Sequence, residues 1–337
     1  MSGPAYRAPL WLPGEHLQTI FPAVVAPRAR IDYRRERWQT PDGDFIDVDF
    51  AIPEPGGDAP LLVLFHGLEG SSDSHYARTL MAAATARGWR GAVAHFRGCS
   101  GEINLRPRAY HSGDSAEVDW ILRRFQARHP DSPRFAVGIS LGANALLKWL
   151  GEQAEAATSV VSAAAGISAP QDLHEGARAL ARGFNRIYTA NFLKSLKRKS
   201  LRKLEQFPGL FDRRRMLEST SFFEFDDAVT APMHGFKGCL DYWRKSSCKQ
   251  FLRAIHVPTL VLNACNDPFL PARHLARRDQ VSSRVELDYP AHGGHVGFVQ
   301  GRFPGRQNWL VERVCGFLER EAIHAANDRR SLETTDG

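Results

Sequence analysis

Ser140 lies between two glycines in the segment Gly138-Ile139-Ser140-Leu141-Gly142, a G-x-S-x-G frame. The apolar run 135–137 before it is typical of a buried parallel strand, and the run 141–150 after it has helical spacing and good helix formers. A strand that turns straight into a helix needs small residues two positions before and after the corner, and the two glycines meet this need. The corner serine is then presented at a helix N-terminus, a position typical of a nucleophile in acyl transfer.

A nucleophilic serine needs a base, and the base needs an orienting carboxylate. In hydrolases with this strand–serine–helix corner, the acid follows a late strand and the histidine follows the last strand. Asp267 follows the apolar run 258–263 in an Asn-Asp-Pro frame, and Asp288 is the alternative acid. His292 and His295 both follow the last predicted strand, so position alone leaves open which is the base. A metal site on the two histidines is a further alternative, although no third ligand is indicated.

An oxyanion needs two backbone N–H groups aimed at one point. Leu141, directly after the serine, supplies the first candidate. His66-Gly67 follows the apolar run 61–65 and matches the loop that supplies the second donor, which makes Leu68 the partner of Leu141. Two such donors favour acyl transfer through a tetrahedral intermediate. For His66 and Glu69 themselves we expect structural roles.

The elements that position these residues alternate between strand and helix along the chain. This order is typical of a parallel sheet with right-handed crossovers. The hydrophobic pattern predicts strands over residues 33–39, 45–52, 61–65, 91–96, 135–137, 159–165, 258–263 and 284–288. It predicts helices over residues 75–87, from about 115 to 125, 141–150 and 308–321. The first two strands read as a hairpin. The sequence therefore predicts an α/β fold whose mostly parallel sheet has an antiparallel N-terminal edge.

The alternation of strands and helices is interrupted between residues 171 and 256, where the sequence predicts helical segments but no clear strand. We therefore predict an α/β core made of residues 31–170 and 257–325, with residues 171–256 as a helical cap or lid insertion over the carboxyl ends of the strands. Two further segments complete the chain: an irregular, proline-rich N-terminal segment (1–30) and a polar, disordered tail (326–337).

The positive charge of the chain is concentrated in this cap. Residues 171–255 contain 17 Lys and Arg against 9 Asp and Glu. We expect the basic face around Lys197, Arg198 and Lys199 to favour anionic or interfacial substrates and to make weak contact with membrane surfaces; the alternative is an ordinary solvated helix face. The aromatic-interleaved pattern of a nucleic-acid-binding module is missing, so we expect no nucleic-acid partner.

The overall composition is that of a globular protein in water, with 43% hydrophobic and 24% charged residues. No apolar run approaches the ~20 residues that span a bilayer, and no secretory signal is visible. The five cysteines form no C-x-x-C pair, which predicts reduced thiols and no structural zinc site. We expect a cytoplasmic location and no cofactor.

Together these motifs resemble the α/β-hydrolases, and within them the YheT-type esterase branch, which is related to eukaryotic hydrolases of lipid and other carboxylic esters. The likeness runs over nearly the whole chain. The segments that carry it are His16-Leu17-Gln18-Thr19, Phe65-His66-Gly67-Leu68-Glu69-Gly70, Phe96-Arg97-Gly98-Cys99-Ser100-Gly101, Tyr110-His111-Ser112-Gly113, Gly138-Ile139-Ser140-Leu141-Gly142-Ala143-Asn144 and Gly293-Gly294-His295-Val296-Gly297-Phe298. The resemblance implies the α/β-hydrolase fold. It also implies that His295, which follows two glycines, is the base rather than His292, and that Asp267 is the acid.

Residues and resemblance together predict a serine carboxylic-ester hydrolase that acts on short- to medium-chain acyl esters, either small molecules or lipids. Ser140, His295 and Asp267 form the predicted triad, and the Leu68 and Leu141 amides form the predicted oxyanion hole. Two alternatives remain: an alcohol acyltransferase of the same fold, and a non-catalytic binding protein on a hydrolase scaffold. The sequence assigns no oligomeric state, and it assigns no role to the segment 11–20, to Arg97 or to His111.

Overall fold

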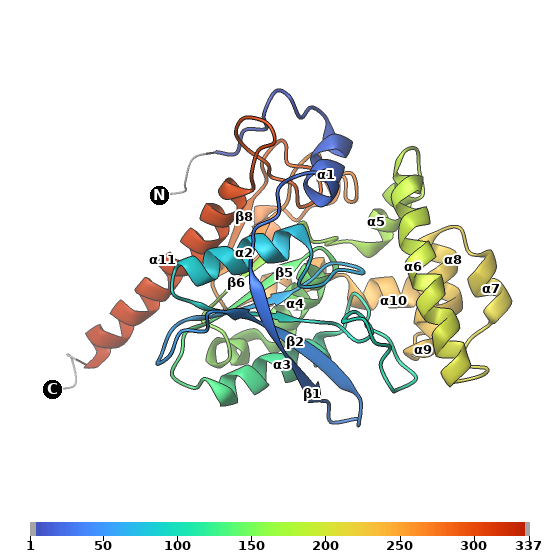
Figure 1. The fold of residues 1–337 in the computed structure, drawn as a ribbon, viewed down its shortest axis with the longest axis horizontal. Helices are drawn as coiled ribbons and strands as arrows, with labels where there is room; N and C mark the ends of the chain where they lie inside the picture. Colours follow the sequence, from blue (N-terminus) through green and yellow to red (C-terminus); the bar gives the residue numbers. More distant parts are fainter. Residues whose placement is uncertain (1–4, 334–337) are drawn as a thin grey trace.

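A twisted β-sheet with helices on both faces forms the core of the molecule (Figure 1). The computed structural model describes residues 5–333, and the side chains of residues 5–324. Within that part of the chain the sheet has eight strands in the order β1-β2-β4-β3-β5-β6-β7-β8. The strands are β1 (Asp32–Gln39), β2 (Phe45–Ile52), β3 (Leu61–Phe65), β4 (Arg90–Ala94), β5 (Arg134–Ile139), β6 (Ala163–Ile167), β7 (Thr259–Leu262) and β8 (Val285–Asp288).

Strands β3 to β8 pair in parallel, whereas β1 with β2 and β2 with β4 are antiparallel. The predicted fold class, a mostly parallel sheet with an antiparallel N-terminal edge, is confirmed. The acidic residues of β2 are buried: Asp47 is 1% exposed and Asp49 is 3% exposed. Their charge is compensated because Arg37 and Arg35 of the neighbouring strand pair with them at 2.8 and 2.7 Å.

The sheet separates two hydrophobic cores, one under each helical layer. Leu61, Val63 and Phe65 point to the core covered by α3 and α4, whereas Leu62 and Leu64 point to the core covered by α2 and α11. This alternation is the two-residue period of a strand that is buried on both faces. The covering helices are α2 (His75–Ala86), α3 (Ser115–Arg128), α4 (Leu141–Gln153) and α11 (Asn308–Glu333).

The sixth strand lies further along the chain than predicted. The predicted strand was 159–165, but Ala154–Ser159 is a 3-10 turn and β6 is Ala163–Ile167. The stretch from 156 to 167 is rich in alanine and other small apolar residues, so its composition has no period that would locate the strand. Its position is set by the pairing of Phe135 with Ala163.

Both ends of the chain contain more helix than expected. In the segment 1–30, predicted to be irregular, α1 (Glu15–Val24) is a regular helix with Pro22 near its end. Proline signals a helix end, yet here it falls in the last turns, where it removes only one intrahelical bond. Helix α11 continues to Glu333, through most of the tail 326–337 that we predicted to be disordered, because the sequence holds good helix formers and no Gly or Pro there. Residues 1–4 and 334–337 lie outside the described residues.

Residues 171–256 leave the sheet after β6, return at β7 and contain no strand. Figure 1 shows their helices gathered at one side of the sheet. The helices are α5 (Leu173–Leu180), α6 (Asn185–Gln206), α7 (Arg213–Glu218), α8 (Phe222–Phe225), α9 (Ala231–Met233) and α10 (Cys239–Ser246). The apolar side of α6, including Leu193, packs on Phe211, Met216 and Phe225, so this segment has a small core of its own.

Candidate active site

Ser140 occupies the sharp corner between β5 and α4. Its backbone has φ 52° and ψ −116°, a conformation that costs a non-glycine residue on the order of 1–3 kcal/mol and is found mostly at functional sites. A Cβ atom at Gly138 would lie 2.5 Å from Ala143 Cα, and one at Gly142 would lie 2.4 Å from the Phe65 carbonyl oxygen. Both neighbours must therefore be glycine for the corner to form.

The structure brings Ser140, His295 and Asp267 into one hydrogen-bonded row. His295 Nε2 lies 2.9 Å from Ser140 Oγ, and His295 Nδ1 lies 2.8 Å from Asp267 Oδ2. The second oxygen of Asp267 accepts a hydrogen bond from the Phe269 N–H at 2.8 Å, and the Phe269 ring stacks on the imidazole at 4.1 Å between centroids. The Asp267 side chain is 1% exposed and that of His295 is 11% exposed. The Asp267 end of the row is thus closed to water, whereas Ser140 and His295 remain partly accessible.

The alternative acid and base lie elsewhere. His292 is exposed, and His295 makes both bonds of the row instead. Asp288, at the end of β8, pairs with Arg313 of α11. The hydrogen-bond geometry therefore favours His295 over His292, which sequence position alone left open, and Asp267 over the alternative Asp288.

Leu68 and Leu141, the residues of the predicted oxyanion hole, lie beside the serine. Both residues line the cavity that contains Ser140, and a Cβ on Gly67 would lie 3.2 Å from Ser140 Cβ. Within residues 5–333 neither amide N–H is bonded to another group of the protein. Two free donors at this position can hold an oxyanion.

His66 and Glu69 hold the loop that carries Leu68. His66 is fully buried, with Nδ1 lying 2.8 Å from the Gly67 carbonyl oxygen and Nε2 accepting from the Phe96 N–H. Burial lowers the pKa of His66 to about 3, so the ring is neutral. Glu69 accepts hydrogen bonds from Tyr110 OH at 2.8 Å and from Lys199 Nζ at 2.7 Å.

Helix α1 joins the loops that carry the acid and the base. Gln18 is 2% exposed, and its Oε1 accepts from the Gly293 N–H and from Asn266 Nδ2, both at 2.9 Å. The neighbouring Thr19 Oγ1 accepts from the His295 N–H at 2.9 Å. Both residues lie in the segment 1–30 that we predicted to be irregular, and we predicted no role for them. One sequence signal for such a role was present, because both residues belong to the motif His16-Leu17-Gln18-Thr19 that carries the family resemblance. No local pattern connects that motif to the loop of Gly293 and His295, more than 270 residues away.

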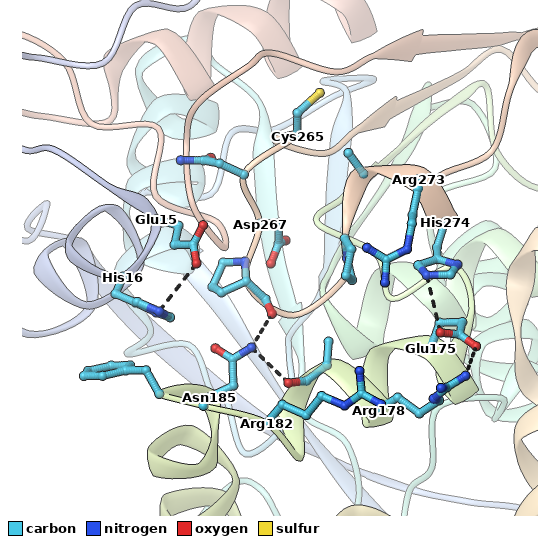
Figure 2. A pocket seen from close by; sticks show the side chains of 17 residues that line it. Glu15, His16, Glu175, Arg178, Arg182, Asn185, Cys265, Asp267, Arg273 and His274 are labelled. Atoms are coloured by element: carbon cyan, nitrogen blue, oxygen red, sulfur yellow. Dashed lines mark hydrogen bonds and ion pairs between the residues drawn. The ribbon is translucent and has the colours of Figure 1, made fainter.

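The cap also contacts the acid loop, as Figure 2 shows. Asn185 at the start of α6 donates from Nδ2 to the Pro268 carbonyl oxygen at 2.7 Å. His16 of α1 contacts the same helix through Tyr188, whose hydroxyl lies 3.2 Å from His16 Nδ1. The segment 11–20 therefore links the core loops to the cap.

The cavity at Ser140 is small and mostly apolar. Its volume is about 100 Å³, and four cap helices contribute to its wall through Leu180 (α5), Phe192 (α6), Phe222 (α8) and Trp243 (α10). A wider, open groove of about 640 Å³ reaches Ser140 from the other side, between α1 and α6. Residues 171–256 thus cover the serine and shape the space beside it.

Two of the three cap residues that we expected to form a free basic face make internal bonds. Lys197 Nζ donates to the carbonyl oxygens of Leu217 and Ser219 at 2.8 and 2.6 Å. Lys199 Nζ pairs with Glu69 and so joins the cap to the core. That expectation was wrong for both lysines, because a lysine on a helix surface shows no sequence signal for the carbonyl or carboxylate that it meets in the fold. Arg198 is exposed.

Arg97 and His111, which had no assigned role, lie in the wall near the cap. Arg97 is 5% exposed and pairs with Glu117 at 2.8 Å and with Asp44 at 2.8 Å, so it is part of a buried ion network. The His111 ring lies 4.5 Å from that of His234 in the cap. Burial lowers the pKa of both histidines.

The remaining expectations concern thiols, metals and membranes. All five cysteines are free; Cys239, Cys248 and Cys315 are buried, and Cys265 is exposed. Among the residues with described side chains, no three His, Cys, Asp or Glu groups are placed to hold a metal ion. None of the described helices is long and apolar enough to cross a membrane.

The chain is similar in sequence to hydrolases of one fold family. Residues 60–302 match the family model described as alpha/beta hydrolase fold. The chain is 38% identical over 306 residues to the Escherichia coli K12 protein named "Putative esterase YheT", which covers 90% of this chain and 89% of that protein. It is 27% identical over 317 residues to the Mus musculus protein named Phospholipase ABHD3, over 92% of this chain and 76% of that one. An esterase of Pyrococcus furiosus shares the fold, with a TM-score of 0.56 at 17% identity over 88% of this chain and 97% of that one.

Proposed function

This chain belongs to the α/β-hydrolase fold family, in its YheT-type branch, and from that premise we propose that it is a serine carboxylic-ester hydrolase. The observation that carries the proposal is the hydrogen-bonded row of Ser140, His295 and Asp267, with distances of 2.9 and 2.8 Å. A nucleophile, a base within hydrogen-bond reach and a group that orients the base are the parts that acyl transfer to serine requires.

In the acylation step, Ser140 Oγ attacks the carbonyl carbon of the ester and its proton passes to His295 Nε2. The Leu68 and Leu141 N–H groups bind the oxyanion that forms. His295 then donates the proton to the departing alkoxide, so that an alcohol leaves and an acyl-serine remains. Asp267 accepts a hydrogen bond from the Nδ1–H group of His295, which stays on the ring, and keeps Nε2 directed at the serine.

In the deacylation step, water takes the place of the alcohol. His295 removes a proton from the water as its oxygen attacks the acyl carbon, and the same two amides bind the second oxyanion. Collapse of this intermediate breaks the bond to Ser140 Oγ, which recovers its proton from His295. The products are the alcohol and the carboxylic acid.

We expect esters with short- to medium-chain acyl groups. The cavity of about 100 Å³ at Ser140 supports this size limit, and its apolar wall favours hydrocarbon groups. A longer chain would have to lie in the open groove between α1 and α6. Relatives named as a phospholipase and a monoacylglycerol lipase extend the substrate class to lipid esters.

We keep the cytoplasm as the proposed location, since five unpaired cysteines fit a reducing compartment. Weak contact of the cap with anionic membrane surfaces also stays a proposal, now assigned to the exposed Lys194, Arg198 and Arg202 of α6. Exposed charges are screened within about 8–10 Å, so binding to phosphatidylserine vesicles should disappear as salt is raised.

A fluorophosphonate probe tests the proposed function directly. The probe should label the wild-type protein at Ser140, identified by peptide mass spectrometry, and should not label Ser140→Ala. Profiling of p-nitrophenyl esters with increasing acyl length should then show a maximum at short to medium chains. Labelling at another serine, or no labelling of folded protein, would contradict the mechanism and favour a non-catalytic binding protein.

A further inference from the structure

A carboxyl group in the cap faces the space beside Ser140. Asp226 begins the π-helical turn Asp226–Thr230, and it lines the same cavity as Ser140 and His295. Turns of this kind are rare in proteins and are frequent at functional sites. Asp226 has no part in the catalytic row, so its position in the wall needs a separate explanation.

The hydrogen bonds of Asp226 leave part of its capacity unused. Its Oδ1 accepts from Thr230 Oγ1 at 2.6 Å, and its Oδ2 accepts from Trp243 Nε1 at 2.8 Å. An ionised carboxylate offers about four acceptor sites. Across the described part of the chain, no Lys, Arg or His side chain forms an ion pair with Asp226, and burial raises its pKa to about 6. The carboxylate at the cavity wall therefore has acceptor capacity left and no neutralising cation among the described residues.

A second cavity, of about 120 Å³, also has Asp226 in its wall. His234 and Lys203 contribute to this wall. His234 Nε2 is buried, and it has no hydrogen-bond partner among the described residues. Leu68, Leu141 and Asp226 line both cavities. Asp226 thus lies in the wall shared by the cavity at Ser140 and a second cavity that holds the unpartnered His234 Nε2.

We propose that Asp226 binds a hydrogen-bond donor carried by the ester, a hydroxyl or an ammonium group, and thereby selects polar esters over apolar ones of the same size. This inference rests on the proposed ester hydrolysis and names the substrate class for that pocket. A methyl group in the same place would strip water from the carboxylate without replacing its hydrogen bonds. A site built to bind a donor rejects analogues that lack it much more strongly than an apolar pocket rejects a change of one methylene.

Matched esters test the proposal on the wild-type protein. On the alcohol side, 2-hydroxyethyl butanoate is compared with propyl butanoate, and 2-(dimethylammonio)ethyl butanoate with 3-methylbutyl butanoate. On the acyl side, methyl 3-hydroxybutanoate is compared with methyl 3-methylbutanoate. We expect kcat/KM to be at least about tenfold higher for the donor-bearing member of one pair, since a hydrogen bond to a charged group contributes that much or more. Equal kcat/KM within every pair would overturn the proposal.

Variants then assign the preference to Asp226. Asp226→Asn keeps the size but removes the charge, and it should reduce the preference to less than about threefold, mainly by raising KM for the donor-bearing ester. Asp227→Asn is the matched control on the same turn, because its carboxylate pairs with Arg215 and lies outside both cavities; it should keep the preference. An equal loss for both members of each pair in Asp226→Asn would assign the residue a structural role only and refute the proposal.

The failure of this inference is distinguishable from failure of the proposed function. If the wild-type protein hydrolyses none of the esters and Ser140 is not labelled, the proposed function itself is wrong. If it hydrolyses them without discrimination, only the role of Asp226 is refuted. The wild-type comparison remains decisive even where Asp226→Asn does not fold.

Discussion

Replacement of Gln18 by alanine should slow catalysis although this residue lies on a helix outside the α/β core. Gln18 Oε1 accepts hydrogen bonds from the Gly293 N–H and from Asn266 Nδ2, each at 2.9 Å, and its Nε2 donates to the Leu12 carbonyl oxygen at 3.0 Å. Gly293 precedes His295, the proposed base, by two residues, and Asn266 directly precedes Asp267, the proposed acid. The amide of Gln18 therefore fixes the relative position of the two loops.

The magnitude follows from the groups that the substitution leaves unpaired. The buried Gly293 N–H would cost about 1–3 kcal/mol, and the half-buried Asn266 amide somewhat less. This is less than the 5–15 kcal/mol that typically separates folded from unfolded protein, so Gln18→Ala should fold. The loops can instead shift until water satisfies both donors. A displacement of about 1 Å at a catalytic group can cost on the order of 100-fold in rate.

We therefore expect kcat for a p-nitrophenyl ester to fall by about 10- to 100-fold in Gln18→Ala, with a small change in KM. Gln18→Glu keeps an acceptor for both donors and should recover most of kcat. Leu17→Ala, at a neighbouring position that is 51% exposed, is the control for general damage to α1 and should change neither kcat nor Tm. If Gln18→Ala lowers Tm but keeps full kcat, α1 contributes only stability and the positioning role is refuted.

The other predictions concern the hydrogen-bonded row of Ser140, His295 and Asp267, and the carboxyl group of Asp226. His295→Ala should lose nearly all turnover while His292→Ala keeps a substantial fraction, because only His295 reaches Ser140 Oγ; steady-state kinetics of both variants would reveal the reverse assignment. Asp267→Asn should lower kcat by roughly 10³–10⁴-fold with little change in thermal melting, since it favours the wrong tautomer of His295; an unchanged kcat would remove Asp267 from the row. The pKa of Asp226 is raised from 3.8 to about 6, so the folded state favours the neutral acid and stability should fall as pH rises from about 4 to above 6. Urea unfolding should show Asp226→Asn gaining stability relative to wild type over this window by up to about 3 kcal/mol, and a difference that does not vary with pH would contradict the raised pKa.

The corner at Ser140 was predictable because its cause is local. A serine with φ 52° between a strand and a helix requires glycines at fixed positions, and the sequence displays them next to an apolar run and a helical run. The order of elements and the antiparallel edge were predictable for the same reason, since each follows from the period of its own residues. The sheet order, and the location of the small-residue strand β6, depend on pairing between strands.

The contacts that complete the site have no local signal. Gln18 and Gly293 are 275 positions apart, and a glutamine in a proline-rich segment looks like any other until the fold brings it to the loop. Asp226 is one of several acidic residues in a charged insertion, and what distinguishes it is that it lines the cavity at Ser140, while its neighbour Asp227 pairs with Arg215. Lys199 looked like a solvated charge and is an ion-pair partner of Glu69. The sequence alone thus determined the candidate nucleophile, the candidate acid and bases and the class of fold, because short-range backbone geometry encodes them. Only the tertiary structure decided which side chains hold and surround them, because burial and partners arise when distant segments pack together.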